Sequence, residues 1–291
     1  MTGSEAVPRV GVIFRPQLPP DKLRGFVNAA EAAGLDDVWL WEDCFLEGGL
    51  TSAAAALAWT TSVRVGLGLM PVPFRNAALA AMEIATLARA FPGRFVPAAG
   101  HGVTRWMDQA GVLVESPMTL LREWVTATRG LLRGQTITAN GVYVQLCGVA
   151  LDWPPSAVPP VLVGARGPKT LALAGEIADG VVLDAGLSPE GVRAAVTTAA
   201  VAASQQVVVN LPCGAGPDAR ERLEAELDPA RGSGPARVAV GSAGAVARSI
   251  RAFAAAGATT VVLQPGGDDP RLDETMSLAA DARAIIARSA G

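Results

Sequence analysis

Short apolar runs alternate with longer segments of helical spacing along the whole chain. Each run is almost continuously hydrophobic and ends near Gly, Pro or Asp. Parallel strands that are covered on both faces show this pattern, because neither face meets water. The chain contains eight such runs, and we expect a strand in each: Arg9–Pro16, Asp36–Asp43, Val63–Val72, Gly93–Gly102, Pro159–Gly167, Gly180–Gly186, Gln206–Gly214 and Thr259–Gly267.

The segments between these runs carry apolar residues at helical spacing. In the first of them, Leu23, Phe26 and Val27 stand at i, i+3 and i+4, and Gly34 supplies a stop. Eight units of strand and helix predict an α/β fold, a closed (β/α)8 TIM barrel that forms a single domain over residues 1–291. A doubly wound open sheet is the alternative.

The connection between the fourth and fifth expected strands, Val103–Val158, contains an insertion. A helix is predicted there, with Ser116 as its N-cap and Gly134 as its stop. Asn140-Gly141 then stands between β-branched and aromatic residues, which predicts a hairpin with a type I′ turn. Because insertions that follow strands lie at the mouth of a barrel, we expect this hairpin and loop to roof a pocket.

Composition narrows the class of protein. Of the 291 residues, 50% are hydrophobic and 18% are charged, which provides for a large core and excludes a disordered chain. The net charge of -3, without a block of Lys or Arg, argues against a nucleic-acid partner. No apolar run approaches the length of a membrane-spanning helix, about 18 residues.

The cysteines and the first residues bear on the compartment. Cys44, Cys147 and Cys213 are far apart and odd in number, so we expect free thiols in a reducing compartment. The start of the chain lacks a positive region followed by an apolar one, so no secretory signal is expected. These observations predict a cytoplasmic protein that acts on a small molecule, without a nucleic-acid or membrane partner.

Glycines dominate the carboxyl ends of the expected strands, where a barrel of this kind builds its site. They stand in "GLG" at 66–68, "GHG" at 100–102 and "GARGPK" at 164–169. A missing Cβ lets the backbone approach a flat ring or a phosphate, although glycines also simply terminate strands. The amides of Ala165, Arg166 and Gly167 could form an anion-binding nest at the start of a helix that Pro168 opens.

Polar side chains at the same ends are candidates for proton transfer. Of Glu42 and Asp43, at most one faces the barrel axis, and a structural salt bridge is the alternative role. His101 is the only histidine and could act as a general acid or base, contact a ligand, or merely pack between its glycines. A second histidine for a metal site is missing, and we expect no metal. Other candidates at these ends are Arg15, Asp184, Cys213 and Gln264.

The sequence resembles the bacterial-luciferase-like superfamily of flavin- and deazaflavin-dependent oxidoreductases. The segments that carry the resemblance are "AAEAAGLDDVWLWED", "VRVGLGLMPVPFRNAALAAMEIATLARAFPGRFVPAAGHG", "PPVLVGARGPKTLALAGEIADGVVL" and "GAVARSIRAFAAAGATTVVLQP". They cover nearly the whole chain in the same order and with similar spacing. Within the superfamily, "GHGVTRWMDQAG" is most similar to members that use the deazaflavin coenzyme F420.

The resemblance implies a barrel with an insertion, a homodimer, and a coenzyme lying across the mouth. Several members have a non-prolyl cis peptide at the end of strand three, and Gly68-Leu69 is the matching bond. The phosphate would lie at Ala165, Arg166 and Gly167. The full set of coenzyme-binding residues implied is Gly68, Leu69, Gly100, His101, Gly102, Trp106, Gly164, Ala165, Arg166 and Gly167. Trp106 could form an apolar wall against the ring or anchor its helix in the core.

The chain departs from its relatives at two places. Members often have Asp-His where this chain has Glu42-Asp43, and related sugar-phosphate dehydrogenases have a catalytic Glu where this chain has Val103. Glucose 6-phosphate oxidation is therefore not expected. The resemblance predicts hydride transfer between F420 and an organic substrate, with Asp43 as the first and His101 as the second choice of proton partner. Alternatives are an FMN-dependent monooxygenase, a non-catalytic flavin-binding protein, and an unrelated phosphate-binding barrel.

Overall fold

The computed structural model describes residues 7–229 and 234–288. Its main sheet is a closed barrel of eight parallel strands, because β11 pairs with β1 and β8 pairs with β9. This closure confirms the predicted (β/α)8 barrel over the open sheet. The barrel strands are β1 Arg9–Phe14, β2 Asp37–Leu40, β3 Arg64–Pro71, β4 Phe95–Gly100, β7 Leu162–Gly164, β8 Gly180–Leu183, β9 Gln206–Gly214 and β11 Thr260–Gln264.

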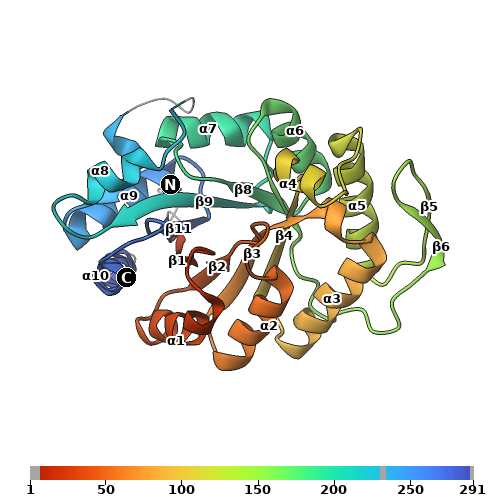
Figure 1. The fold of residues 1–291 in the computed structure, drawn as a ribbon, viewed down its shortest axis with the longest axis horizontal. Coiled ribbons are helices and arrows are strands. Elements are labelled where there is room, and N and C mark those ends of the chain that lie inside the picture. Colours follow the sequence, from red (N-terminus) through yellow and green to blue (C-terminus); the bar gives the residue numbers. More distant parts are fainter. Residues whose placement is uncertain (1–6, 230–233, 289–291) are drawn as a thin grey trace, which may run out of the picture.

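Helices surround the strands on the outside of the barrel (Figure 1). A two-residue strand, β10 at Ala239–Val240, extends the sheet beside the end of β9. None of the described helices is long and apolar enough to cross a membrane. The α-helices are α1 Leu23–Ala32, α2 Gly49–Trp59, α3 Ala77–Ala90, α4 Thr104–Gln109, α5 Pro117–Leu132, α6 Pro168–Ile177, α7 Pro189–Thr198, α8 Ala219–Ala225, α9 Ala243–Ala255 and α10 Leu272–Arg288.

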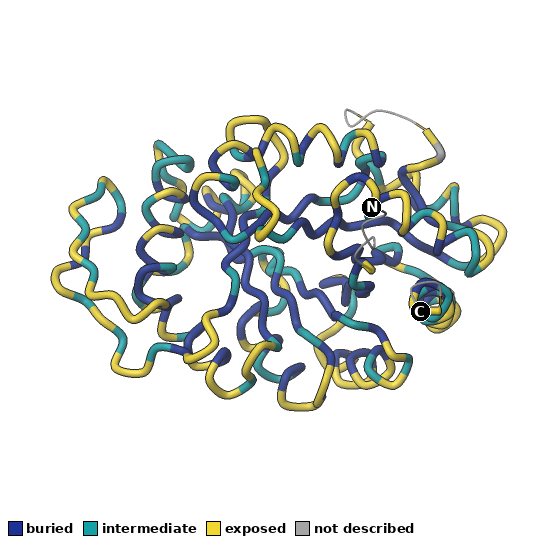
Figure 2. The backbone as a smooth tube through the Cα atoms, turned by 180° about the vertical axis from the view of Figure 1, so that it is seen from behind, coloured by how far each residue is buried: buried dark blue, intermediate teal, exposed yellow. Residues whose placement is uncertain are grey.

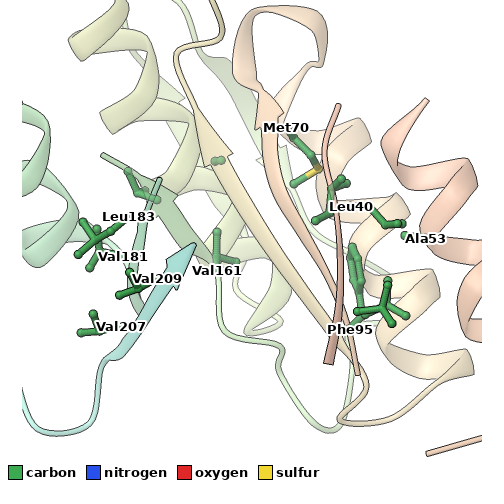
Figure 3. Packing of buried hydrophobic residues seen from close by; sticks show 14 of the residues in the cluster. Leu40, Ala53, Met70, Phe95, Val161, Val181, Leu183, Val207 and Val209 are labelled. Carbon is green, nitrogen blue, oxygen red and sulfur yellow. The ribbon is translucent and has the colours of Figure 1, made fainter. Parts of the chain in front are cut away.

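The core has two parts, one outside and one inside the ring of strands. The larger part lies between strands and helices, and Figure 3 shows Leu40 of β2 in it, facing the helix that carries Ala53. The strands run through the buried middle of the molecule, while the outer faces of the helices are exposed (Figure 2). The smaller part fills the barrel and consists of Ile13, Trp39, Val96, Ala98, Leu162, Val182, Val208 and Val262.

Strand alternation places a second layer of inward-facing residues above this inner cluster. Side chains two residues apart on a strand share a face, so each barrel strand contributes one more residue toward its carboxyl end. We call this set the mouth layer, because it lies where the strands of a barrel open. Its members are Arg15, Trp41, Gly68, Gly100, Gly164, Asp184, Asn210 and Gln264.

The inserted hairpin is present, but its predicted turn type is wrong. β5 (Ile137–Asn140) and β6 (Gln145–Val149) pair through Asn140 and Gln145, which leaves a four-residue loop instead of a two-residue turn. Gly141 does not have the positive φ that a type I′ turn needs. The loop is shaped by the Glu123 carboxylate of α5, which accepts the amides of Val142, Tyr143 and Val144 at 2.8, 2.8 and 2.9 Å.

The hairpin also does not roof the barrel mouth as expected. It follows α5 along the chain and packs on that helix, where Ile137 lies against Gly130. Figure 1 shows β5 and β6 at the edge of the molecule, beyond α5 and away from the barrel strands. The insertion therefore covers a helix, because its amides are held by a side chain of α5 rather than by any residue of the mouth.

Glu31, at the end of α1, ties that helix to the turn before β3. Its Oε1 accepts the backbone amides of Thr61, Ser62 and Val63 at 2.8, 2.6 and 3.1 Å. Burial opposes the charge, but these hydrogen bonds outweigh it and lower the pKa of Glu31 from 4.5 to about 2. The carboxylate thus contributes stability that the protonated form does not.

We expect Glu31→Gln to lower the melting temperature at pH 7 and to have less effect in acid. Because the pKa is lower in the folded protein, the contribution is fully present above pH 4.5 and is lost as the pH falls toward about 2. Thermal melts of both proteins followed by circular dichroism between pH 7 and pH 3 test this. A gap between the two melting temperatures that stays constant over this range would contradict the assignment.

Candidate functional site

The mouth of the barrel has a bulge at the end of β3. Pairing between β3 and β4 shifts between Leu67 and Met70, and the peptide bond Gly68-Leu69 inside the shift is cis. This confirms the feature that the resemblance implied. The side chain of Leu69 is half-buried and lies over the mouth layer, in contact with the inner cluster.

Glycines make room for this side chain rather than for a bare slot. A Cβ placed on Gly100 or on Gly164 would overlap the methyl groups of Leu69, and one on Gly66 would overlap the ring of Trp39. At Gly100 and Gly164 the missing Cβ therefore admits the side chain of Leu69, and not directly the flat ring that the sequence suggested. A ligand at the mouth would rest on Leu69, which the glycines allow to reach across the strands.

The anion-binding end lies at the start of α6, with one correction. Gly167 is the N-cap and Pro168 opens the helix as predicted. The amide of Ala165 donates to the carbonyl of Val182 at 3.1 Å, so it does not belong to the nest. The amides of Arg166 and Gly167 have no hydrogen-bond partner in residues 7–229 and 234–288, and a Cβ on Gly167 would meet open space.

The side chain of Arg166 points away from the N-terminus of α6 and toward Asp184. It is 71% exposed and forms an ion pair with Asp184, which follows β8. The positive charge stays near the nest, while the backbone at Gly167 remains accessible. Free amides at a helix N-terminus are a site that a phosphate can occupy.

His101 lies beside this anion-binding end. Its Nε2 is 3.3 Å from Oγ1 of Thr170 in the first turn of α6. Burial lowers the pKa of His101, and the carbonyl of Pro117 opposes that effect, so the imidazole is neutral at pH 7. A neutral ring can donate or accept one hydrogen bond at each nitrogen without adding a charge.

The residues after His101 fix the first turn of α4. Gly102 has a φ of +72°, and a Cβ there would stand 2.8 Å from the sulfur of Met107, so a glycine is required. Met107 is buried and anchors α4 in the core, whereas Trp106 is only half-buried. Trp106 therefore keeps the exposed surface that an apolar wall would need, and its role stays a prediction.

The two neighbouring carboxylates after β2 have different surroundings. Glu42 binds Arg75 through two hydrogen bonds of 2.6 Å and accepts the amide of Gly49 at 3.0 Å. Its role is the structural salt bridge that was one of the two alternatives. Asp43 makes no side-chain hydrogen bond or ion pair within the described ranges.

Asp43 lies in a cavity of about 430 Å³ between the loops that follow β2 and β3. Burial raises the pKa of Asp43 above its ordinary value of 3.8, and the charge of Arg15 opposes the rise. The guanidinium of Arg15 lies 5.0 Å above the ring of Trp41. A carboxyl group with a raised pKa and no fixed partner can hold or release a proton.

The structure brings some of the predicted residues together and leaves others apart. His101, Gly167 and Thr170 form one end of the mouth, whereas Asp43 stands with Arg15 and Trp41 at another. No interaction joins Asp43 to His101 in the part of the chain that the structure describes. Among the other candidates, Cys213 is buried with its pKa raised to about 12, so it is not a reactive thiol.

Sequence reasoning included Gln264 but missed Asn210. Both belong to the mouth layer, and the side-chain oxygen of each is buried without a hydrogen-bond partner among the described residues. The available signal was the alternation along β9, where Asn210 follows Val208 by two residues and therefore points to the same face. A polar residue in an otherwise continuous apolar run marks the position.

Comparison with known proteins gives three findings. A family model described as luciferase-like monooxygenase matches residues 6–235. The chain is 31% identical over 268 residues to a 5,10-methylenetetrahydromethanopterin reductase of Methanolobus tindarius, covering 89% of this chain and 75% of that protein. It is 31% identical over 191 residues to an F420-dependent glucose-6-phosphate dehydrogenase of Mycobacterium avium, covering 60% of this chain and 56% of that protein.

Solved structures share the fold. An F420-dependent secondary alcohol dehydrogenase, in complex with an F420-acetone adduct, superposes with a TM-score of 0.82. It is 20% identical and covers 94% of this chain and 98% of that chain. The similarity extends over the whole barrel. The curated relatives differ in how much of them is matched, since the chain spans 75% of the Methanolobus reductase but little more than half of the dehydrogenase.

Proposed function

This chain belongs to the luciferase-like monooxygenase family, and from that membership and the geometry of the mouth we propose that it is an oxidoreductase that transfers a hydride between coenzyme F420 and a small organic substrate. Relatives at about the same identity whose names specify F420 support this coenzyme over FMN. F420 carries a hydride on its deazaflavin ring, and the protein orients that ring.

The observation that carries the proposal is that the barrel mouth has both the bulge at Leu69 and a helix N-terminus, that of α6, with free amides. The unpartnered amides of Arg166 and Gly167 would bind the coenzyme phosphate, and no atom of the described residues, apart from its chain neighbours, lies within 4 Å of a Cβ placed on Gly167. Leu69 would support one face of the ring, and the neutral His101 would contact the coenzyme next to its phosphate, beside the first turn of α6. These residues fit a flat ring that carries a phosphorylated chain.

The chain's own residues would position the coenzyme and move a proton. Gly102 and Met107 hold the turn that places His101, and Trp106 would cover part of the ring. The set proposed to contact the coenzyme remains Gly68, Leu69, Gly100, His101, Gly102, Trp106, Gly164, Ala165, Arg166 and Gly167, with Ala165 acting through its position and not its amide. Asp43 would hold the proton that is exchanged with the substrate.

Coenzyme titrations of the native protein and two variants test the proposal. We expect F420 to bind with a micromolar or lower Kd and FMN to bind at least about tenfold more weakly. Gly167→Asp places a carboxylate on the amides of α6, so it should weaken F420 binding at least about tenfold while stabilising the helix as an N-cap. Gly167→Ala is the matched control, because its Cβ meets nothing and its φ of −90° suits alanine.

The readout is the fluorescence of the coenzyme, with melting temperatures measured in parallel. If FMN binds more tightly than F420, FMN is the coenzyme, and an FMN-dependent monooxygenase becomes the better assignment. Unchanged F420 affinity in Gly167→Asp would move the phosphate away from α6. Absence of binding for both coenzymes would overturn the proposed function.

We also propose that residues 1–291 form one domain that acts as a homodimer in the cytoplasm. The first and last barrel strands pair with each other, which supports a single domain. All three cysteines are free, which suits a reducing compartment. An exposed apolar surface around the loops after β2 and β3 and on α3 supports a second copy as partner, and it consists of Phe45, Leu46, Phe74, Leu79 and Met82. All of these except Met82 also line the cavity at Asp43, so the second copy would form the outer wall of that cavity.

A further inference from the structure

Two buried carboxamides at the barrel mouth have unused hydrogen-bonding capacity. Asn210 is 5% exposed and Gln264 is 8% exposed. Oδ1 of Asn210 and Oε1 of Gln264 are buried without a hydrogen-bond partner among the residues described. A buried polar group without a partner costs stability, because it has lost its hydrogen bonds to water and gained none, so such groups call for an explanation.

Their positions place them side by side at the mouth. Asn210 follows Val208 and Gln264 follows Val262 by two residues, and both valines belong to the inner cluster. Asn210 is paired with Val262 across β9 and β11, so Gln264 is its diagonal neighbour on the same face. The two amides therefore point into the barrel from adjacent strands, each one step beyond the inner-cluster valine of its own strand.

The charges around this pair are already neutralised. Arg15 donates to Glu226 at 3.2 Å and to the carbonyl of Pro265 at 3.1 Å. The side chain of Arg166 is paired with Asp184, another member of the mouth layer. A phosphate or carboxylate brought to this wall would have to compete with these existing partners.

We propose that Asn210 and Gln264 form the part of the substrate site that recognises an uncharged group able both to donate and to accept hydrogen bonds, such as a hydroxyl or an amide. The unpartnered atoms are carbonyl oxygens, which need a donor and repel an anion, while the NH2 group of each carboxamide can donate to an acceptor on the same substrate group. The inference rests on the proposed function, since it names the substrate class of the same mouth. It also explains why the chain keeps two polar residues in otherwise apolar strands.

Stability of the coenzyme-free protein gives the first test. Asn210→Leu and Gln264→Met keep the approximate shape but remove the unpaired polar atoms, so each should raise the melting temperature by about 2 °C. Gln205→Met is the control, because the side-chain amide of Gln205 donates to the carbonyls of Gly175 and Ala178 at 3.0 and 2.9 Å. Loss of these two hydrogen bonds should lower the melting temperature. A lower melting temperature in both Asn210→Leu and Gln264→Met, as in the control, would assign the pair a structural role and overturn the inference.

Binding of two probes of nearly equal shape gives the second test. Cyclohexanecarboxamide and cyclohexanecarboxylate differ mainly in charge, and saturation-transfer NMR follows both with and without F420. We expect the carboxamide to bind at least about tenfold more tightly than the carboxylate. Asn210→Leu and Gln264→Met should each weaken carboxamide binding at least about tenfold.

The outcomes separate this inference from the proposed function. Preference for the carboxylate, no binding of either probe, or unchanged affinity in both variants would overturn the substrate subsite even if F420 binds. Failure of F420 to bind would overturn the proposed function, while the melting temperatures and the probes would still test the amide pair. Unaltered F420 affinity in both variants is expected, because neither residue belongs to the set proposed to contact the coenzyme.

Discussion

Gly175→Ala is expected to destabilise the protein by about 2 kcal/mol, although alanine is the better helix former. Gly175 lies inside α6, where a Cβ would overlap the carbonyl oxygen of Ala199 at the end of α7. That oxygen belongs to the backbone and cannot rotate away, so one of the two helices must shift. Overpacking costs about 1–3 kcal/mol, and a clash with a fixed backbone atom lies at the upper end, about 3 kcal/mol, which exceeds the roughly 1 kcal/mol that alanine adds to a helix.

The matched control is Gly25→Ala, in α1. A Cβ there meets nothing within 4 Å, so only the gain in helix propensity remains, up to about 1 kcal/mol. Urea unfolding of both variants gives the free energies of unfolding directly. Opposite signs are expected, and an equal or higher stability of Gly175→Ala would mean that α6 and α7 are not in the contact described.

The fold was predictable because its strands are buried on both faces. Runs such as that of β9 are apolar throughout, and all eight expected runs contain a barrel strand. The type of the hairpin turn was not predictable, since Asn140-Gly141 favours a two-residue turn locally. The Glu123 carboxylate, on α5, holds three loop amides and decides the conformation instead. A contact between distant residues overrides a local preference.

The site was predictable in outline and not in its contacts. The glycines at strand ends marked the mouth, but the sequence could not show that Leu69 lies across Gly100 and Gly164. It also could not show that the amide of Ala165 is used by the sheet. Both facts depend on how the strand ends are staggered around the barrel, which no local pattern encodes.

Asp43→Asn is expected to lower turnover about 100-fold or more while leaving F420 affinity within about twofold. Asparagine keeps the shape of the side chain but cannot hold or release a proton, and general acid–base catalysis contributes about 10²–10⁴-fold. The surroundings of Asp43 support this role, because burial raises its pKa and its carboxylate has no hydrogen bond or ion pair to any residue in 7–229 or 234–288. Turnover is followed by the absorbance of F420 with a substrate that the native enzyme converts.

The dependence of stability on pH distinguishes this role from a structural one. Because the pKa of Asp43 is higher in the folded protein, its ionisation weakens folding as the pH rises above 3.8. Asp43→Asn should therefore melt at or above the native temperature at pH 7, and the difference should disappear below pH 3.8. Glu42→Gln is the control with the opposite behaviour, since it loses charge-assisted hydrogen bonds to Arg75 and should melt lower. An Asp43→Asn protein with native turnover would remove this carboxyl from the reaction and leave His101 as the remaining proton partner.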